Sequence, residues 1–360
     1  MLLTRGGRYS LLDFARFLAA ICVVIYHYQH FMEKPYLQTL SWYPYIDLFI
    51  EKGYLAVPFF WTLSGFVIAS TYTPATWRGA RRFFLFRFAR LYPLHLVTLI
   101  LVTMLQIVSL QLNGYGLIYT NQNISNFLFH LFFLSGFSES LNGNYFSFNA
   151  PVWSVSLEIM CYGLFALLMV LKKLKSYIIY LLFMAVIFID AYSELPDQLV
   201  RVNLYFFTGV IIYFLKVEQN KVYRYFFFIF YFSCLLLSIG QTPTFLMNVF
   251  PSLQIFQYRY IALFALVISI LLWLEPRVSS SISKKFIQLG NLSYAIYLLH
   301  IPTQLILLIT VPLFFENSKF IAGEIMFFIA FLFIVLIFSN LIFKHFEEPC
   351  RQRIRRVLDE

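Results

Sequence analysis

The chain has 360 residues, of which 61% are hydrophobic and only 12% are charged, with a mean hydropathy of +0.75. Soluble domains are about 45–50% apolar and about 25% charged, so this chain carries too little charge to cover a water-facing surface. The same values exclude intrinsic disorder, a coiled coil and a small disulfide scaffold. The composition therefore predicts an all-α integral membrane protein with many membrane-spanning helices.

The net charge of +10 would suggest a nucleic-acid partner in a soluble protein. In a membrane protein, basic residues instead mark the cytoplasmic loops, and we expect no nucleic acid. The four cysteines stand apart and form no CxxC pair, so we expect neither a metal site nor a disulfide framework. Arg5 and Arg8 precede the first apolar run, which has no small-residue cleavage site. This pattern favours a retained first helix over a signal peptide.

Ten apolar runs qualify as spans of about 20 residues. In chain order they are 12–32, 54–73, 92–112, 151–171, 176–193, 201–216, 225–241, 258–274, 291–314 and 321–343. An eleventh run, 124–137, is short and is flanked by Asn, Ser and Gly. If this run does not span, 21 basic residues fall inside and five fall outside; if it spans, the division is 10 inside and 16 outside.

The positive-inside rule therefore favours about ten transmembrane helices with both termini in the cytoplasm. Residues 1–360 then form a single transmembrane domain. In it, 113–150 is an extracytoplasmic loop that contains a short re-entrant or capping segment.

Ionisable residues inside spans normally face a cavity or a partner because lipid cannot solvate them. The first run carries Asp13, Arg16 and His27, the run 151–171 carries Glu158, and the run 291–314 carries His300. At 1.5 Å per residue, His27 and Glu158 both lie roughly 20 Å above the inner face. A histidine beside a carboxylate can act as a general base, whereas the alternative is a structural hydrogen-bonded pair.

By the same arithmetic, Ser64 and His300 fall near the middle of the membrane. Five arginines between 78 and 90 precede the third run. They are either an orientation signal or a polyphosphate site approached from the cytoplasm. Arg87 and Arg90 stand three residues apart, so on a helix they share a face.

Six strings stand in order along the chain: LLDFARFLAAICVVIYHY in the first run, GYLAVPFFWTLSGFVI at 53–68, FRFARLYPLHL at 86–96, PVWSVSLEIMCY at 151–162, LGNLSYAIYLLHIP at 289–302 and FEEP at 346–349. Together, along 12–349, they resemble the bacterial membrane acyltransferase family 3. One departure is Ala56-Val57-Pro58, where the family usually has Gly-Val-Asp. The resemblance covers nearly the whole chain, so residues 1–360 are expected to be one transmembrane acyltransferase domain.

The resemblance implies an O-acetyltransferase of the bacterial inner membrane. It would move an acetyl group from cytoplasmic acetyl-CoA to a hydroxyl of an extracytoplasmic glycan such as lipopolysaccharide O-antigen. His27 would be the catalytic histidine, Arg16 its motif partner and Glu158 the motif acid. Arg87 and Arg90, with Arg81 and Arg82, would bind the donor. The remaining motif residues would line the substrate pocket: Ser64, Trp153, Ser154, Tyr297 and His300.

Two alternatives stay open on the sequence. Direct transfer needs no Ser or Cys nucleophile, and an acetyl-histidine intermediate is a second chemical route. The other class of function is a glycan-lipid transporter or flippase, in which the buried charges line a passage. Such proteins often carry inverted repeats or paired broken helices, and the sequence shows neither. Turnover of acetyl-CoA by the purified protein separates the two classes.

Overall fold

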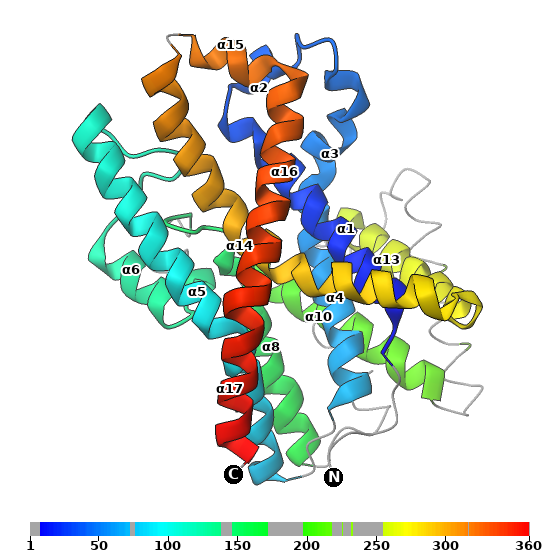
Figure 1. Cartoon of the computed structure of the whole chain (residues 1–360). Helices are drawn as coiled ribbons and strands as arrows, with labels where there is room; N and C mark the ends of the chain where they lie inside the picture. The colour runs from blue at the N-terminus through cyan, green and yellow to red at the C-terminus, as the bar shows by residue number, and fades with distance from the viewer. Residues whose placement is uncertain are drawn as a thin grey trace, which may run out of the picture. The chain divides into compact units, whose positions relative to one another are not determined.

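A computed structural model describes residues 8–72, 76–137, 146–171, 197–217, 225, 232, 255–315 and 317–359. Every regular element within these residues is helical (Figure 1). Eight helices in this part of the chain are long and apolar enough to cross a membrane. The composition therefore predicted the fold class correctly, and the protein is an all-helical, multi-pass membrane protein.

Eight long helices follow predicted runs in the described residues. They are α1 (Ser10–His27), α4 (Ala56–Thr71), α5 (Trp77–Asn113), α8 (Val152–Val170), α10 (Asp197–Val217), α13 (Ile255–Leu274), α14 (Ser280–Phe314) and α16 (Ile325–Ile342). The polar α17 (Glu348–Asp359) follows the last predicted run. The predicted runs 176–193 and 225–241 lie outside the described residues, apart from two isolated positions. The count of ten spans and the cytoplasmic termini stay predictions.

Two boundaries differ from the sequence expectation. The helix α5 begins at Trp77, so the arginines between 78 and 90 lie on a helix and not in a loop. The helix α14 begins at Ser280, eleven residues before the predicted run, because its polar first turns carry no hydropathy signal. The segment 124–137 holds α6 (Ile124–Leu131), whose eight residues are too few to span as a helix, and a short 3-10 turn at Ser135–Phe137.

The chain divides into two compact units, each built from separate stretches of sequence. The first unit comprises 1–13, 58–83 and 158–286, and the second comprises 14–57, 84–157 and 287–360. The helices α1, α4, α5, α8 and α14 each contribute residues to both units.

In the first unit, α4 and α10 approach so closely that only glycine fits at two contacts. A Cβ added to Gly65 would lie 1.9 Å from the Phe206 carbonyl oxygen, and one added to Gly209 would lie 1.9 Å from the Thr62 carbonyl oxygen. Small residues allow such close backbone approach, which is a common basis of helix pairing in lipid. Around this contact packs an apolar core that includes Leu63.

This contact predicts that Gly65→Ala destabilises the protein. The added methyl group meets backbone atoms and forces the two helices apart, an overpacking effect that typically costs about 1–3 kcal/mol. Thermal unfolding of the purified protein in detergent measures the change. The control is Gly116→Ala, whose added Cβ would meet only side-chain atoms, the nearest at 3.2 Å. Equal melting temperatures for the two variants would contradict the close α4–α10 contact.

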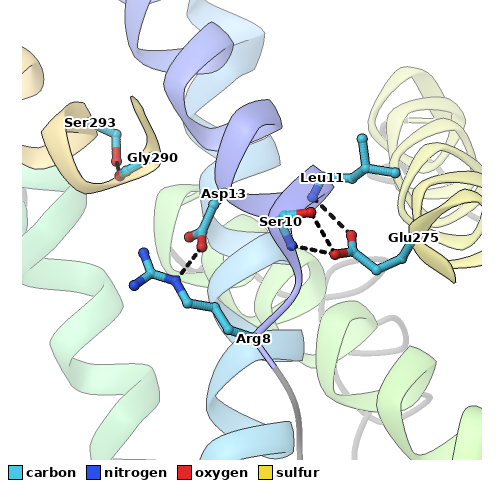
Figure 2. Close-up of polar contacts among 7 residues, drawn as sticks. All are labelled: Arg8, Ser10, Leu11, Asp13, Glu275, Gly290 and Ser293. Carbon is cyan, nitrogen blue, oxygen red and sulfur yellow. Dashed lines mark hydrogen bonds and ion pairs between the residues drawn. The ribbon is translucent and has the colours of Figure 1, made fainter. Parts of the chain in front are cut away.

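Glu275 fixes the start of α1 within the same unit. Its carboxylate accepts hydrogen bonds from the backbone N–H of Ser10 at 2.6 Å and of Leu11 at 2.8 Å, and from the Ser10 hydroxyl at 2.7 Å. These N–H groups have no partner inside the helix, and the helix dipole favours an anion there. Figure 2 shows Glu275 facing this helix start, beside the Arg8–Asp13 ion pair. The N–H groups at the start of α1 thus have a hydrogen-bond acceptor.

In the second unit, two aromatic side chains donate hydrogen bonds to the last carbonyl groups of the short helix α15 (Ser318–Gly323). The Tyr28 hydroxyl donates to the Ala322 carbonyl at 2.7 Å, and the Trp42 indole N–H donates to the Gly323 carbonyl at 2.9 Å. The last carbonyls of a helix need such outside donors. The segment after α1, with the short helices α2 (Lys34–Leu37) and α3 (Asp47–Lys52), is attached to α15 in this way.

Candidate active site

The imidazole rings of His27 and His300 form a stacked pair in the second unit. Their centroids lie 4.9 Å apart, and Nε2 of His300 is 3.1 Å from Nδ1 of His27. His27 is the last residue of α1 and is half-buried, whereas His300 on α14 is fully buried. The structure thus joins a predicted catalytic residue to a predicted pocket residue.

The surrounding carbonyl groups assign the protons on the two rings. Nδ1 of His300 lies 3.3 Å from the Ile296 carbonyl, and Nδ1 of His27 lies 3.0 Å from the Val23 carbonyl. A carbonyl only accepts, so each Nδ1 carries the hydrogen of a neutral ring. Nε2 of His300 is then an acceptor and receives the Nδ1–H of His27, which it shares with Val23. This leaves Nε2 of His27 with its lone pair, as a base requires.

Gln304 connects the pair to a third histidine. Its amide donates to the His27 carbonyl at 2.8 Å, at the end of α1. Its oxygen lies 3.2 Å from Nδ1 of His30, and the Tyr119 hydroxyl lies 3.5 Å from Nε2 of His30. Every contact in this series can pair a donor with an acceptor when all three histidines are neutral. Gln304 was missed from sequence, although it stands one turn after His300 on α14.

A second group of polar residues lies on the same stretch of α14. The Tyr297 hydroxyl is 2.7 Å from the Ser154 hydroxyl and donates to the Pro151 carbonyl at 2.8 Å. Asn149 donates to the Leu298 carbonyl at 3.0 Å. Trp153 is half-buried in the first turn of α8. The predicted residues Ser154 and Tyr297 therefore contact each other within the unit that holds His27.

Glu158 and Ser64 meet in the first unit through a residue that the sequence analysis did not select. The Tyr162 hydroxyl donates to Glu158 at 2.5 Å and lies 3.1 Å from the Ser64 hydroxyl. Because Tyr162 gives its only proton to Glu158, Ser64 must donate to Tyr162. Tyr162 stands four residues after Glu158 on α8, and this spacing is the signal by which sequence could have found it.

The predicted arginines fall at different places. Arg16 lies eleven residues before His27 on α1, which is about three full turns, so both side chains leave the same helix face about 16 Å apart. Arg87 and Arg90 are half-buried on α5 in the second unit, whereas Arg81 and Arg82 are exposed in the first. Their part in donor binding stays a prediction.

His27 and Glu158 belong to different units, so their pairing also stays a prediction. Among the described residues, no group of three or more His, Cys, Asp or Glu is placed to hold a metal ion. Another buried histidine pair was missed. His95 donates to the His130 carbonyl at 2.7 Å, and burial lowers the pKa of His130 on α6 to about 3. His130 is therefore neutral at physiological pH.

Comparison with known proteins agrees with the helices and motifs described above. The family model described as an acyltransferase domain, that of acyltransferase family 3, matches residues 9–344. Comparisons with curated proteins and with solved structures found no match. The family match begins just before α1 and ends within the helical turn that follows α16, so it includes both units. The chain therefore belongs to acyltransferase family 3, and it is a transmembrane acyltransferase.

Proposed function

We propose that this protein is an O-acetyltransferase that uses acetyl-CoA from the cytoplasm to modify an extracytoplasmic glycan, with lipopolysaccharide O-antigen as the expected class of acceptor. We place it in the bacterial inner membrane. The observation that carries the proposal is the His27–His300 pair, which joins two helices, α1 and α14, that are long and apolar enough to span a membrane in a family 3 acyltransferase. A neutral imidazole with a free Nε2 is the group that deprotonating an alcohol requires.

In the proposed reaction, Nε2 of His27 takes the proton of the acceptor hydroxyl while the oxygen of that hydroxyl attacks the thioester carbonyl carbon. The new C–O bond forms, the C–S bond breaks, and the thiolate leaves. The His27 imidazolium then returns its proton to the thiolate, so protons and charge balance. His300 holds the Nδ1 side of His27 throughout, because its Nε2 accepts the Nδ1–H.

Glu158 supplies negative charge in this proposal and stabilises the imidazolium. The Ser64–Tyr162–Glu158 series supports this part, because the Tyr162 hydroxyl, which accepts from Ser64, donates to the carboxylate and holds it in one orientation. Arg87 and Arg90, with Arg81 and Arg82, bind the phosphates of the donor, and Arg16 lies on the helix face that leads to His27. Trp153, Ser154 and Tyr297 contact the acceptor.

The test of the function is turnover by the purified full-length protein in lipid nanodiscs. Release of free coenzyme A from acetyl-CoA, faster with added glycan, is the expected result. Mass spectrometry of the host glycan, with and without the gene, should show the loss of one acetyl group per modified unit. Movement of an intact glycan lipid without any acetyl transfer would instead establish the transporter alternative.

Glu158→Gln should slow acetyl transfer without abolishing it. The amide keeps the shape and still accepts from Tyr162, but it cannot stabilise the imidazolium. Loss of a charged hydrogen-bond partner, worth about 1.5–3 kcal/mol, corresponds to about 10–100-fold in rate. Steady-state release of coenzyme A measures the effect.

The control is Tyr162→Phe, which removes the hydroxyl group but leaves the carboxylate, and which should slow the reaction less. A Glu158→Gln variant as fast as the wild type would remove Glu158 from the mechanism. It would leave the His27–His300 pair unaffected.

A further inference from the structure

The closing motif of the sequence, FEEP, has no part in the reaction described so far. It lies at the junction of α16 and α17, where residues Phe343–Glu347 form a π-helix. Single π turns within helices are rare and occur frequently at functional sites. The extra residue in the turn changes which face the following side chains occupy. Here it accompanies a carboxylate, Glu347, that is only 4% exposed.

Arginines from two helices surround Glu347 in the second unit. Arg90 of α5 and Arg351 of α17 lie close enough to stabilise the Glu347 carboxylate electrostatically, and Arg351 also makes an ion pair with Glu348 at 2.5 Å. Arg351 is in turn within electrostatic range of Arg355. A buried carboxylate therefore holds two guanidinium groups that would otherwise repel each other.

The contacts have the register of an antiparallel helix pair. The Arg355 guanidinium lies 5.3 Å from the centre of the Phe86 ring. Arg90, one turn after Phe86 on α5, is near Arg351, one turn before Arg355 on α17. Phe86 and Arg90 share one face of α5, and Arg351 and Arg355 share one face of α17. The charged end of α17 is thus attached beside the charged part of α5. In Figure 1, α17 is the terminal red helix.

The buried nitrogen atoms of this cluster are not all satisfied. Three buried atoms of this cluster have no hydrogen-bond partner within the described residues: Nε of Arg351, Nε of Arg355 and one carboxylate oxygen of Glu347. Buried polar groups almost always have partners, so such atoms indicate an absent ligand or water. Within this cluster Arg90, Arg351 and Arg355 outnumber the two carboxylates, Glu347 and Glu348, and the excess of positive charge favours an anion.

We infer that Arg351 and Arg355 of the C-terminal helix, together with Arg87 and Arg90, form a binding site for the phosphate groups of a nucleotide, with Glu347 as the residue that positions Arg90 and Arg351. The inference rests on the proposed function, in which the nucleotide is the phosphate-bearing end of coenzyme A. It adds a second helix to a donor site that the sequence placed on α5 alone. Arginine suits such a site because its planar fork binds phosphate oxygens in pairs.

The test is titration of the purified full chain with coenzyme A in zwitterionic nanodiscs. The double variant Arg351→Ala/Arg355→Ala should bind about 10–100-fold more weakly, the range expected when a charge-assisted hydrogen bond is lost. The matched control is Arg353→Ala/Arg356→Ala, which removes the same charge from exposed positions of the same helix and should leave the affinity unchanged. Equal effects of the two double variants would overturn the inference.

A milder variant guards against misfolding. Arg351→Lys/Arg355→Lys keeps the charge that orients the chain but loses the fork, so a partial loss of affinity is expected, and full affinity would argue against a phosphate site. If the alanine variant keeps its affinity for coenzyme A but loses stabilisation by anionic lipid, the cluster binds lipid headgroups and the inference is wrong. If the wild-type protein does not bind coenzyme A, the proposed function fails as well.

Discussion

His27→Ala should abolish glycan acetylation while leaving expression and donor binding nearly intact. Nε2 of His27 carries the lone pair that takes the acceptor proton, and alanine has no group to replace it. Loss of a positioned general base typically lowers the rate by about 10²–10⁴-fold. Mass spectrometry of the glycan detects the loss in cells, and coenzyme A release by the purified variant gives its size.

The control for this prediction is His345→Ala, which removes an exposed histidine from the π turn after α16. It should acetylate at the wild-type rate. Coenzyme A titration of the His27→Ala variant separates loss of chemistry from loss of binding, since the base acts only in the transfer step. A His27→Ala protein that acetylates normally would show that the proposed mechanism is wrong, although membership of the family would stand.

His300→Ala should lower kcat by about 10–100-fold with little change in KM for acetyl-CoA. Metal-bound histidines typically lose about 10–100-fold in activity when the outer hydrogen-bond partner of the ring is removed, because that partner fixes the orientation and tautomer of the ring. Without the Nε2 acceptor, the Nδ1–H of His27 keeps only the Val23 carbonyl, and the ring can turn. His300 is in this sense a positioning residue.

The conservative variant His300→Gln distinguishes positioning from a general structural defect. Its amide oxygen can accept the His27 Nδ1–H, so part of the lost kcat should return. A leucine of similar size at this position should give no such recovery. If glutamine and leucine reduce kcat equally, or if the loss appears in KM instead, His300 does not position the base.

Hydrogen bonds from α14 hold the residues around His27. Gln304 holds both the end of α1 and His30, so α14 contributes two of the groups that contact His27, His300 and Gln304. His30 and Tyr119 complete the network. Because every described contact in it joins neutral groups, the site avoids the cost of an unpaired charge in lipid. The His27 ring is neutral in this arrangement, and its Nε2 lone pair can accept a proton.

The sequence by itself determined the fold class. A chain with so few charges can satisfy its backbone in lipid only through helices, and apolar runs of about 20 residues mark their positions. All eight predicted runs that fall within the described residues are helical. The ordered motifs likewise identified the family, which the match to residues 9–344 confirms. These properties depend on composition and local pattern, which a sequence displays directly.

Only the tertiary structure decided which polar residues meet. Depth arithmetic placed His300 near the middle of the membrane, about ten residues into its helix, and paired His27 with Glu158 instead. The helix α14 begins at Ser280, eleven residues before the predicted run, and the depth of His300 in the membrane stays a prediction. Hydropathy cannot detect polar first turns, and depth alone does not say which helix faces which. The 3.1 Å contact between His27 and His300 therefore came from packing, which brings together residues 273 positions apart.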